Sequence, residues 1–119
     1  MTEHAYDVVI IGSGAGGGTV AAALAPLVSG GLRVLVLEQG PRFRDDEFTG
    51  REFEMASVLY RDGGGFLTAQ GTMTLAFANA YGGSTVVYTG TSLTAPERVI
   101  TGWRVPGITH ADLLARSRR

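Results

Sequence analysis

Two short apolar runs near the start of the chain set the expected fold. Residues 8–11 (Val-Val-Ile-Ile) and 32–37 (Leu-Arg-Val-Leu-Val-Leu) show little polar alternation, which is typical of strands buried on both faces of a parallel sheet. Residues 19–25, between them, are rich in helix formers, and Pro26 follows. We therefore predict an α/β fold with a βαβ unit over residues 6–40, whose two strands are parallel and joined by a right-handed crossover.

The rest of the chain predicts only short additional helices and strands. Residues 42–54 are strongly charged and are expected to be exposed. Weaker patterns predict a helix over residues 50–60, a strand over 66–77 and a short strand over 99–100. Residues 84–93 are ambiguous, because Ser84 or Thr85 can cap a helix to Leu93, whereas residues 86–88 favour a strand. Thr109 and Asp112 have the spacing of a capping box and predict a final helix over 109–119.

Composition and charge argue against several classes of protein. Ten Lys and Arg against 11 Asp and Glu give a net charge of −1, so we expect neither a nucleic-acid binder nor a protein of anionic membrane surfaces. The lack of cysteine excludes disulfides, thiolate metal sites and Cys nucleophiles. No apolar run is long enough for a transmembrane helix, and the acidic leader does not resemble a signal peptide. We therefore expect a cytoplasmic protein, and we interpret the acidic residues 45–47 as a solvated face without a metal.

Glycine carries the strongest motif. It accounts for 18 of 119 residues, about twice the average frequency. Residues 12–17 (Gly-Ser-Gly-Ala-Gly-Gly) match G-x-G-x-x-G between the first strand and the helix. In dinucleotide-binding units, Gly12 would permit the tight turn, Gly14 would let a pyrophosphate lie against the backbone, and Gly17 would let the helix pack against the strand. The N–H groups and dipole at the start of the helix would attract the phosphates.

Glu38 extends this motif, because it ends the second strand about 20 residues after Gly17, the spacing of dinucleotide-binding folds. A carboxylate there accepts hydrogen bonds from ribose hydroxyls and repels a 2′-phosphate, which disfavours NADP. The alternatives at this point are a glycine-rich turn without a ligand and a solvated acid at a strand end.

Two segments together resemble the glucose–methanol–choline (GMC) family of FAD-dependent oxidoreductases. Residues 6–40 are similar to the ADP-binding start of flavin enzymes, and residues 38–40 (Glu-Gln-Gly) resemble their E-x-G. Residues 78–85 (Ala-Asn-Ala-Tyr-Gly-Gly-Ser-Thr) are similar to the first signature of the family, and residues 103–106 (Trp-Arg-Val-Pro) also resemble it. The resemblance covers most of this chain, but only the N-terminal part of a family member.

The resemblance implies that residues 1–119 are a partial FAD-binding domain. The ADP-binding unit would occupy residues 6–40, and residues 41–119 would contain the second glycine turn and the flavin side. FAD is the implied cofactor. A complete member would oxidise the CH–OH group of an alcohol to a carbonyl, with hydride transfer to the flavin. The implied cofactor-binding residues are Gly12, Ser13, Gly14, Ala15, Gly16, Gly17, Glu38, Gln39, Asn79, Gly82, Gly83, Ser84 and Thr85.

The catalytic part of the family has no counterpart in this sequence. The family's catalytic histidine lies late in a longer chain, and neither His4 nor His110 matches it; both are interpreted as solvated. Val87 or Tyr88 stands where the family often has Asn or His, so a histidyl-flavin bond is excluded there. We therefore assign no catalytic residue and no substrate domain, and we expect the chain to be inactive alone.

Two alternatives to this interpretation remain open. One is a fragment of another FAD- or NAD-dependent oxidoreductase with the same fold. The other is a non-catalytic nucleotide-binding module, either from a truncated gene or as one half of a split protein whose partner chain supplies the rest. An alcohol substrate is expected only in a complete family member. The isolated βαβ unit would expose sheet edges and apolar faces, so we expect poor solubility or dimerisation.

Overall fold

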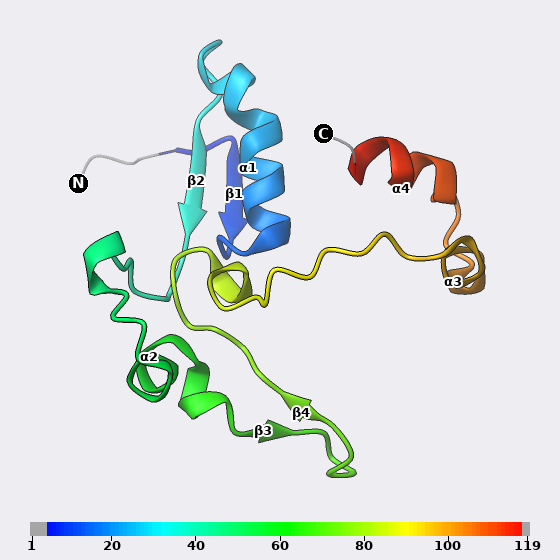
Figure 1. Ribbon diagram of the computed structural model, residues 1–119. Coiled ribbons are helices and arrows are strands. Elements are labelled where there is room, and N and C mark those ends of the chain that lie inside the picture. Colours follow the sequence, from blue (N-terminus) through cyan, green and yellow to red (C-terminus); the bar gives the residue numbers. More distant parts are fainter. Residues whose placement is uncertain (1–4, 118–119) are drawn as a thin grey trace. The chain divides into compact units, whose positions relative to one another are not determined.

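The computed structural model describes residues 5–117, which form two compact units, one ending at Tyr88 and one beginning at Thr89 (Figure 1). The first unit contains β1 (Val8–Ile11), α1 (Ala15–Val28), β2 (Val34–Leu37), α2 (Glu52–Leu59), β3 (Phe66–Leu67) and β4 (Thr74–Leu75). It also has 3-10 turns at Asp45–Glu47, Arg61–Gly64 and Gly83–Val86. The second unit contains α3 (Glu97–Trp103) and α4 (His110–Ser117).

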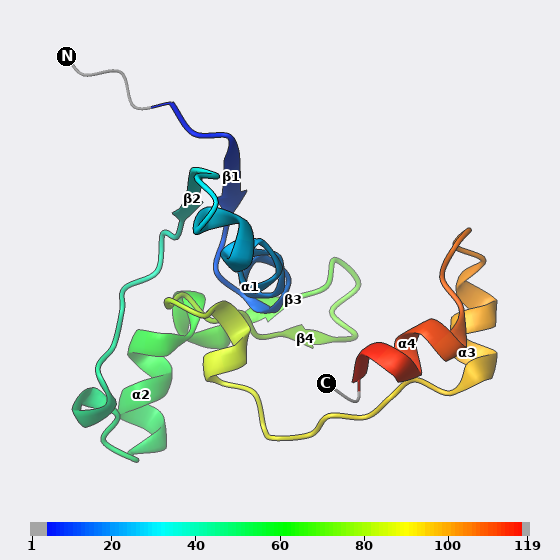
Figure 2. The same cartoon turned by 90° about the horizontal axis from the view of Figure 1, so that it is seen from above.

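The predicted βαβ unit is confirmed. β1 and β2 pair in parallel, with Val8 opposite Val34 and Ile11 opposite Leu37, and α1 connects them (Figures 1 and 2). The helix is longer than predicted, since it starts at Ala15 and continues two residues beyond Pro26. Proline is tolerated there because it removes only one helical hydrogen bond close to the end of the helix.

The two strands are less buried than predicted. Ile10 faces α1 and is 8% exposed, but its neighbours Val9 and Ile11 are 51% and 86% exposed. Within the described residues, β1 and β2 form a sheet of two strands only, so one helix covers one face and leaves the other open. The expectation of burial on both faces is therefore wrong for this chain, and the expected uncovered apolar face is present.

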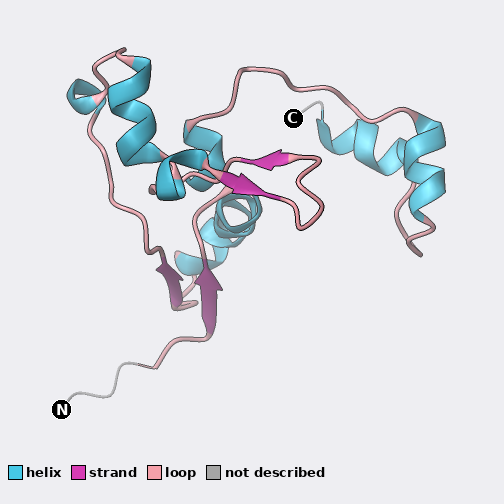
Figure 3. Cartoon of the chain, turned by 90° about the horizontal axis from the view of Figure 1, so that it is seen from below, coloured by secondary structure: helices cyan, strands magenta, loops and turns pink. Residues whose placement is uncertain are grey.

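The segment after β2 forms a helix and a small hairpin. α2 lies within the range predicted for a helix. The strand predicted over residues 66–77 is instead two short strands, β3 and β4, which pair antiparallel (Figure 3). The turn between them is closed by the hydroxyl of Thr68, which accepts hydrogen bonds from the N–H groups of Thr72 and Met73, each at 3.2 Å. These local bonds divide the predicted strand.

Residues 84–93 form neither the helix nor the strand considered for them. Gly82 and Gly83 adopt left-handed conformations, with φ of 100° and 57°, and Gly83 begins a single 3-10 turn that ends at Val86. The Thr85 hydroxyl donates to the carbonyl of Gly82 at 2.6 Å, and the Ser84 hydroxyl accepts from the N–H of Ala78 at 3.2 Å. Both hydroxyls are thus bound to nearby backbone groups and do not cap a helix.

The second unit is a pair of short helices. The strand predicted over residues 99–100 is wrong, because these residues lie inside α3, where Ile100 is buried. The capping box is confirmed: the N–H of Thr109 donates to the Asp112 carboxylate at 3.3 Å, and the N–H of Asp112 donates to the Thr109 hydroxyl at 3.1 Å.

Several predictions are not decided by the fold. No helix within residues 5–117 has the length and apolar character to cross a membrane, and the cytoplasmic location stays a prediction. His4, which we interpreted as solvated, and the last two residues of the predicted final helix lie outside the described residues.

Candidate functional site

The first glycine turn directs backbone donors toward the carboxyl ends of the strands. Gly12 leaves β1 with φ of 89°, and its N–H donates to the carbonyl of Leu37 at 2.7 Å. The first helical hydrogen bond runs from Gly18 to the carbonyl of Gly14 at 2.8 Å. The N–H groups of the three residues before Gly18 therefore precede the hydrogen-bonded ladder. The first turn of α1, residues 15–18, is made only of Ala and Gly, so small residues surround these donors at the helix terminus.

Gly17 brings α1 close to β1. A Cβ atom on Gly17 would lie 1.9 Å from the carbonyl oxygen of Gly12 and 3.2 Å from Cγ2 of Ile10. Only glycine fits at this distance, which confirms the predicted packing role of Gly17.

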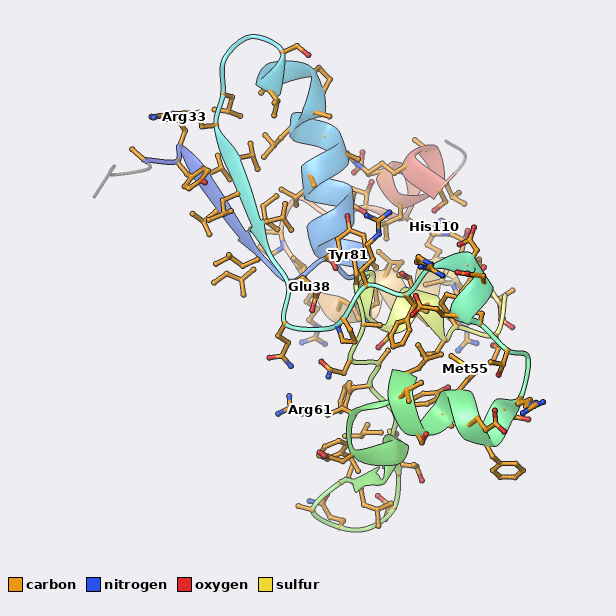
Figure 4. The ribbon with its side chains drawn as sticks, turned by 90° about the vertical axis from the view of Figure 1, so that its left-hand side faces the viewer. Arg33, Glu38, Met55, Arg61, Tyr81 and His110 are labelled. Carbon is orange, nitrogen blue, oxygen red and sulfur yellow. The ribbon has the colours of Figure 1, made fainter. Side chains whose placement is uncertain are left out.

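Glu38 lies at the end of β2, beside the first glycine turn (Figure 4). Its Oε1 accepts a hydrogen bond from the N–H of Gly40 at 2.8 Å. Its Oε2 accepts from the N–H of Ser13 at 2.8 Å and from the Ser13 hydroxyl at 2.7 Å. These bonds, that from Gly40 foremost, lower the pKa of Glu38 from 4.5 to about 2. Glu38 is therefore a fixed anion at neutral pH, with remaining acceptor capacity for a ligand.

The second glycine turn lies directly against the first. The N–H of Gly82 donates to the Ser13 hydroxyl at 2.8 Å, although 69 residues separate them. A Cβ on Gly83 would lie 3.0 Å from the Cα of Gly14. The two glycine-rich motifs of the sequence therefore form one site, with their backbones in contact.

The residues after β2 hold the second turn from another side. A Cβ on Gly40 would lie 2.3 Å from the backbone nitrogen of Ala80, which is 1% exposed. The N–H of Tyr81 donates to the carbonyl of Pro41 at 2.9 Å. The side-chain amide of Gln39 donates to that of Asn79 at 3.3 Å. The glycine of the E-x-G pattern thus makes room for the second turn, a role that the sequence analysis missed.

A crevice of about 520 Å³ lies between these segments. Six of the predicted residues line it: Gly12, Gly14, Glu38, Gln39, Gly83 and Ser84. Four apolar or small residues that sequence reasoning missed also line it: Ile11, Leu37, Phe77 and Ala78. Ile11 and Leu37 end their strands, and ligands of parallel sheets bind at these carboxyl ends. That rule identifies Ile11 and Leu37 from the sequence. Ala78 opens the segment 78–85 that resembles the family signature but was not assigned to the site, and we find no comparable signal for Phe77.

The other predicted residues support the crevice from outside its lining. Ala15, Gly16 and Gly17 form the first turn of α1. Four more are engaged in the hydrogen bonds between or within the turns: Ser13, Asn79, Gly82 and Thr85. The geometry brings these residues together, and cofactor binding by them remains a prediction.

His110, the histidine within the described residues, does not line this crevice. His110 is the first residue of α4 and, with Glu97 and Arg104, lines a pocket of about 300 Å³ within the second unit. Within residues 5–117 there is no group of three acidic, His or Cys side chains placed to hold a metal ion.

Comparison with known proteins supports the dinucleotide-binding fold. Residues 10–64 match the family model of an NAD(P)-binding Rossmann-like domain. The chain is 40% identical over 97 residues to a long-chain-alcohol oxidase of Arabidopsis thaliana, a match that covers 82% of this chain and 13% of that protein. It is 39% identical over 116 residues to an uncharacterized GMC-type oxidoreductase of Mycobacterium tuberculosis, covering 92% of this chain and 18% of that protein.

A third relative is the cholesterol oxidase of Mycobacterium tuberculosis, which is 37% identical over 113 residues and covers 83% of this chain and 19% of that protein. No solved structure matches the chain. The chain thus spans 13% to 19% of the length of these relatives. The predicted Rossmann-like α/β fold is confirmed.

Proposed function

Because the homologues of this chain are GMC-type oxidoreductases, as its sequence resemblance predicted, we propose that it binds FAD for the oxidation of alcohols. Homology and fold already make it the dinucleotide-binding part of an oxidoreductase. The proposal adds the identity of the cofactor and the reaction. The observation that carries it is the crevice in which the helix N-terminus, Glu38 and the second glycine turn meet.

The residues of the crevice fit the ADP half of FAD. The N–H groups at the start of α1 suit the pyrophosphate, and no side chain of the Ala and Gly residues there obstructs it. The carboxylate of Glu38 suits a ribose hydroxyl, because the group stays ionised and three of its roughly four acceptor positions are in use, which leaves one on Oε1. A 2′-phosphate would be repelled by the same charge, so NADP is disfavoured.

The other end of the crevice suits the flavin half. Gly83 and Ser84 offer backbone and hydroxyl groups, and Ile11, Leu37 and Phe77 add apolar surface. Bound FAD would supply the hydride acceptor for the oxidation of an alcohol to a carbonyl, with a separate base accepting the hydroxyl proton. The residues of this chain bind and orient the cofactor.

We place the base and the substrate-binding residues outside residues 1–119, in the rest of a polypeptide or in a partner chain. The relatives are five to eight times longer than the matched segment, on the basis of coverage of 13% to 19%, and the described histidine, His110, is not among the residues that line the crevice. The chain alone is therefore expected to show no alcohol-dependent reduction of a dye. Turnover by the purified chain with FAD and an alcohol would overturn this part of the proposal.

NAD is the second candidate cofactor, because the matched family model is described as NAD(P)-binding. Equilibrium dialysis of the whole chain against FAD, NAD and NADP separates the candidates. We expect FAD to bind most tightly and NADP most weakly. Preferential binding of NAD would support the alternative oxidoreductase class, and binding of none would contradict the proposed function.

A further inference from the structure

We propose that Ser13 is a positioning residue that couples the two halves of the crevice. Its hydroxyl joins the carboxylate of Glu38 to the N–H of Gly82, so the ribose side and the flavin side take their shape together. The inference rests on the proposed function for its ligand, but its structural content concerns the protein alone.

The hydroxyl of Ser13 has a defined hydrogen-bond direction. Gly82 N–H can only donate, and it lies 2.8 Å from Ser13 Oγ. The ionised carboxylate of Glu38 can only accept, and its Oε2 lies 2.7 Å from the same Oγ. The hydroxyl proton must therefore point to Glu38 while a lone pair of Oγ receives Gly82. The result is a continuous chain of donors from the second turn, through Ser13, to the carboxylate.

The backbone of Ser13 binds Glu38 independently of the side chain. Its N–H also donates to Glu38 Oε2, at 2.8 Å, so the main chain alone already holds Glu38 to the first turn. The side chain adds the connection to Gly82. Replacement of Ser13 by alanine therefore keeps the bond between the first turn and Glu38 but leaves the N–H of Gly82 without its acceptor.

The position of Gly82 matters for the flavin side of the crevice. The next two residues, Gly83 and Ser84, line the crevice, and Gly83 is in tight contact with Gly14. A loosened Gly82 would release both lining residues. Packing of Gly40 against Ala80 holds the turn from the opposite side, so we expect a local loosening and not unfolding.

This geometry separates the effects on two ligands. ADP uses the first turn and Glu38, which remain joined in Ser13→Ala, whereas FAD also needs the second turn. We expect Ser13→Ala to weaken FAD binding about tenfold, the scale of one hydrogen bond, and ADP binding clearly less. Ser13→Thr retains the hydroxyl and should restore FAD affinity. Ser57→Ala is the matched control, because Ser57 Oγ donates to the carbonyl of Glu54 on α2, away from the crevice.

Hydrogen exchange of the Gly82 amide tests the same coupling without any ligand. We expect this amide to exchange slowly in the wild type, about tenfold faster in Ser13→Ala, and slowly again in Ser13→Thr. Glu38→Ala gives a second route, because the free hydroxyl loses its orientation and exchange at Gly82 should again accelerate.

The outcomes distinguish this inference from the proposed function. Unprotected exchange of Gly82 in the wild type, or equal exchange and equal FAD affinity in wild type and Ser13→Ala, would overturn the coupling. A protected Gly82 amide that Ser13→Ala exposes, in a chain that binds neither FAD nor ADP, would support the coupling and contradict the proposed function.

Discussion

Gly17 in the first turn of α1 lies so close to Gly12 at the end of β1 that a Cβ on Gly17 would stand 1.9 Å from the carbonyl oxygen of Gly12. This contact fixes the start of the helix against the end of the strand. It thereby determines where the first N–H groups of α1 point, and these groups are the donors of the candidate pyrophosphate site.

The first prediction concerns this contact. Gly17→Ala should destabilise the chain by about 1–3 kcal/mol, because the added methyl group overlaps a backbone oxygen that cannot move alone. Gly16→Ala is the control: its Cβ would meet no described atom within 4 Å, and it should raise the free energy of unfolding by about 0.4–1 kcal/mol. Urea unfolding measures both. Equal free energies of unfolding for the two variants would contradict the close contact between Gly17 and Gly12.

A second prediction follows from the charge of Glu38. Hydrogen bonds, first that from Gly40 and then those from Ser13, lower the pKa of Glu38 to about 2 from 4.5. Folding therefore favours the ionised form, so the stabilisation is complete above about pH 4.5 and is lost as the pH falls toward 2. Glu38→Gln should be less stable than wild type at neutral pH, and the difference should shrink in this acid window. If the difference in free energy of unfolding between the two proteins does not change with pH, Glu38 does not stabilise the fold through its charge.

The comparison with Glu38→Gln isolates one carboxylate among several. The pKa of Asp7 is lowered by Arg33, and that of Asp46 by Arg44, so acid destabilises the wild type at more than one position. Both proteins share those groups, and only the difference between their free energies of unfolding reports on Glu38.

Third, the contact of Gly40 with Ala80 should control cofactor affinity. A Cβ on Gly40 would lie 2.3 Å from the nitrogen of Ala80, so Gly40→Ala should displace the second turn and weaken FAD binding by about tenfold or more. Equilibrium dialysis measures the change in affinity. Gly102→Ala is the matched control, because its Cβ would meet no described atom within 4 Å. Unchanged affinity in a folded Gly40→Ala protein would show that the second turn does not shape the site.

A fourth prediction concerns the open face of the sheet. Val9 is 51% exposed beside the 86% exposed Ile11, which favours association of the isolated chain. Sedimentation velocity should show a concentration-dependent increase in size, and Val9→Thr should reduce it while keeping a β-branched side chain. Phe53→Ser on α2 is the control: Phe53 is 92% exposed but lies outside the sheet face that Val9 and Ile11 share, so its replacement should have a smaller effect if association uses that face. A monomer at all concentrations would contradict the prediction.

The sequence predicts the βαβ unit well because its signals are local. The apolar runs, the glycine turn and the acid at position 38 each report on the backbone within a few residues. The burial of the strands was predicted wrongly. Val9 and Ile11 are apolar, as is typical of a strand inside a larger sheet. The described residues, however, provide only two strands for this sheet and one helix to cover it.

The second glycine turn shows where local patterns are insufficient. Its resemblance to a family signature identified Gly83 and Ser84 as site residues, and both line the crevice. Its conformation was not predictable, because it depends on contacts with Ser13 and Gly40, which lie far away in sequence. Phe77 was missed because it precedes the signature segment, and Ala78, the first residue of that segment, was not assigned to the site.

The location of the cofactor is tested most directly by amide NMR spectra of the whole chain during titration with FAD. The proposed arrangement predicts the largest shifts at Gly14, at residues 15–17 and at Gly83 and Ser84. Shifts confined to the second unit, with the signals of residues 14–17 unchanged, would contradict it.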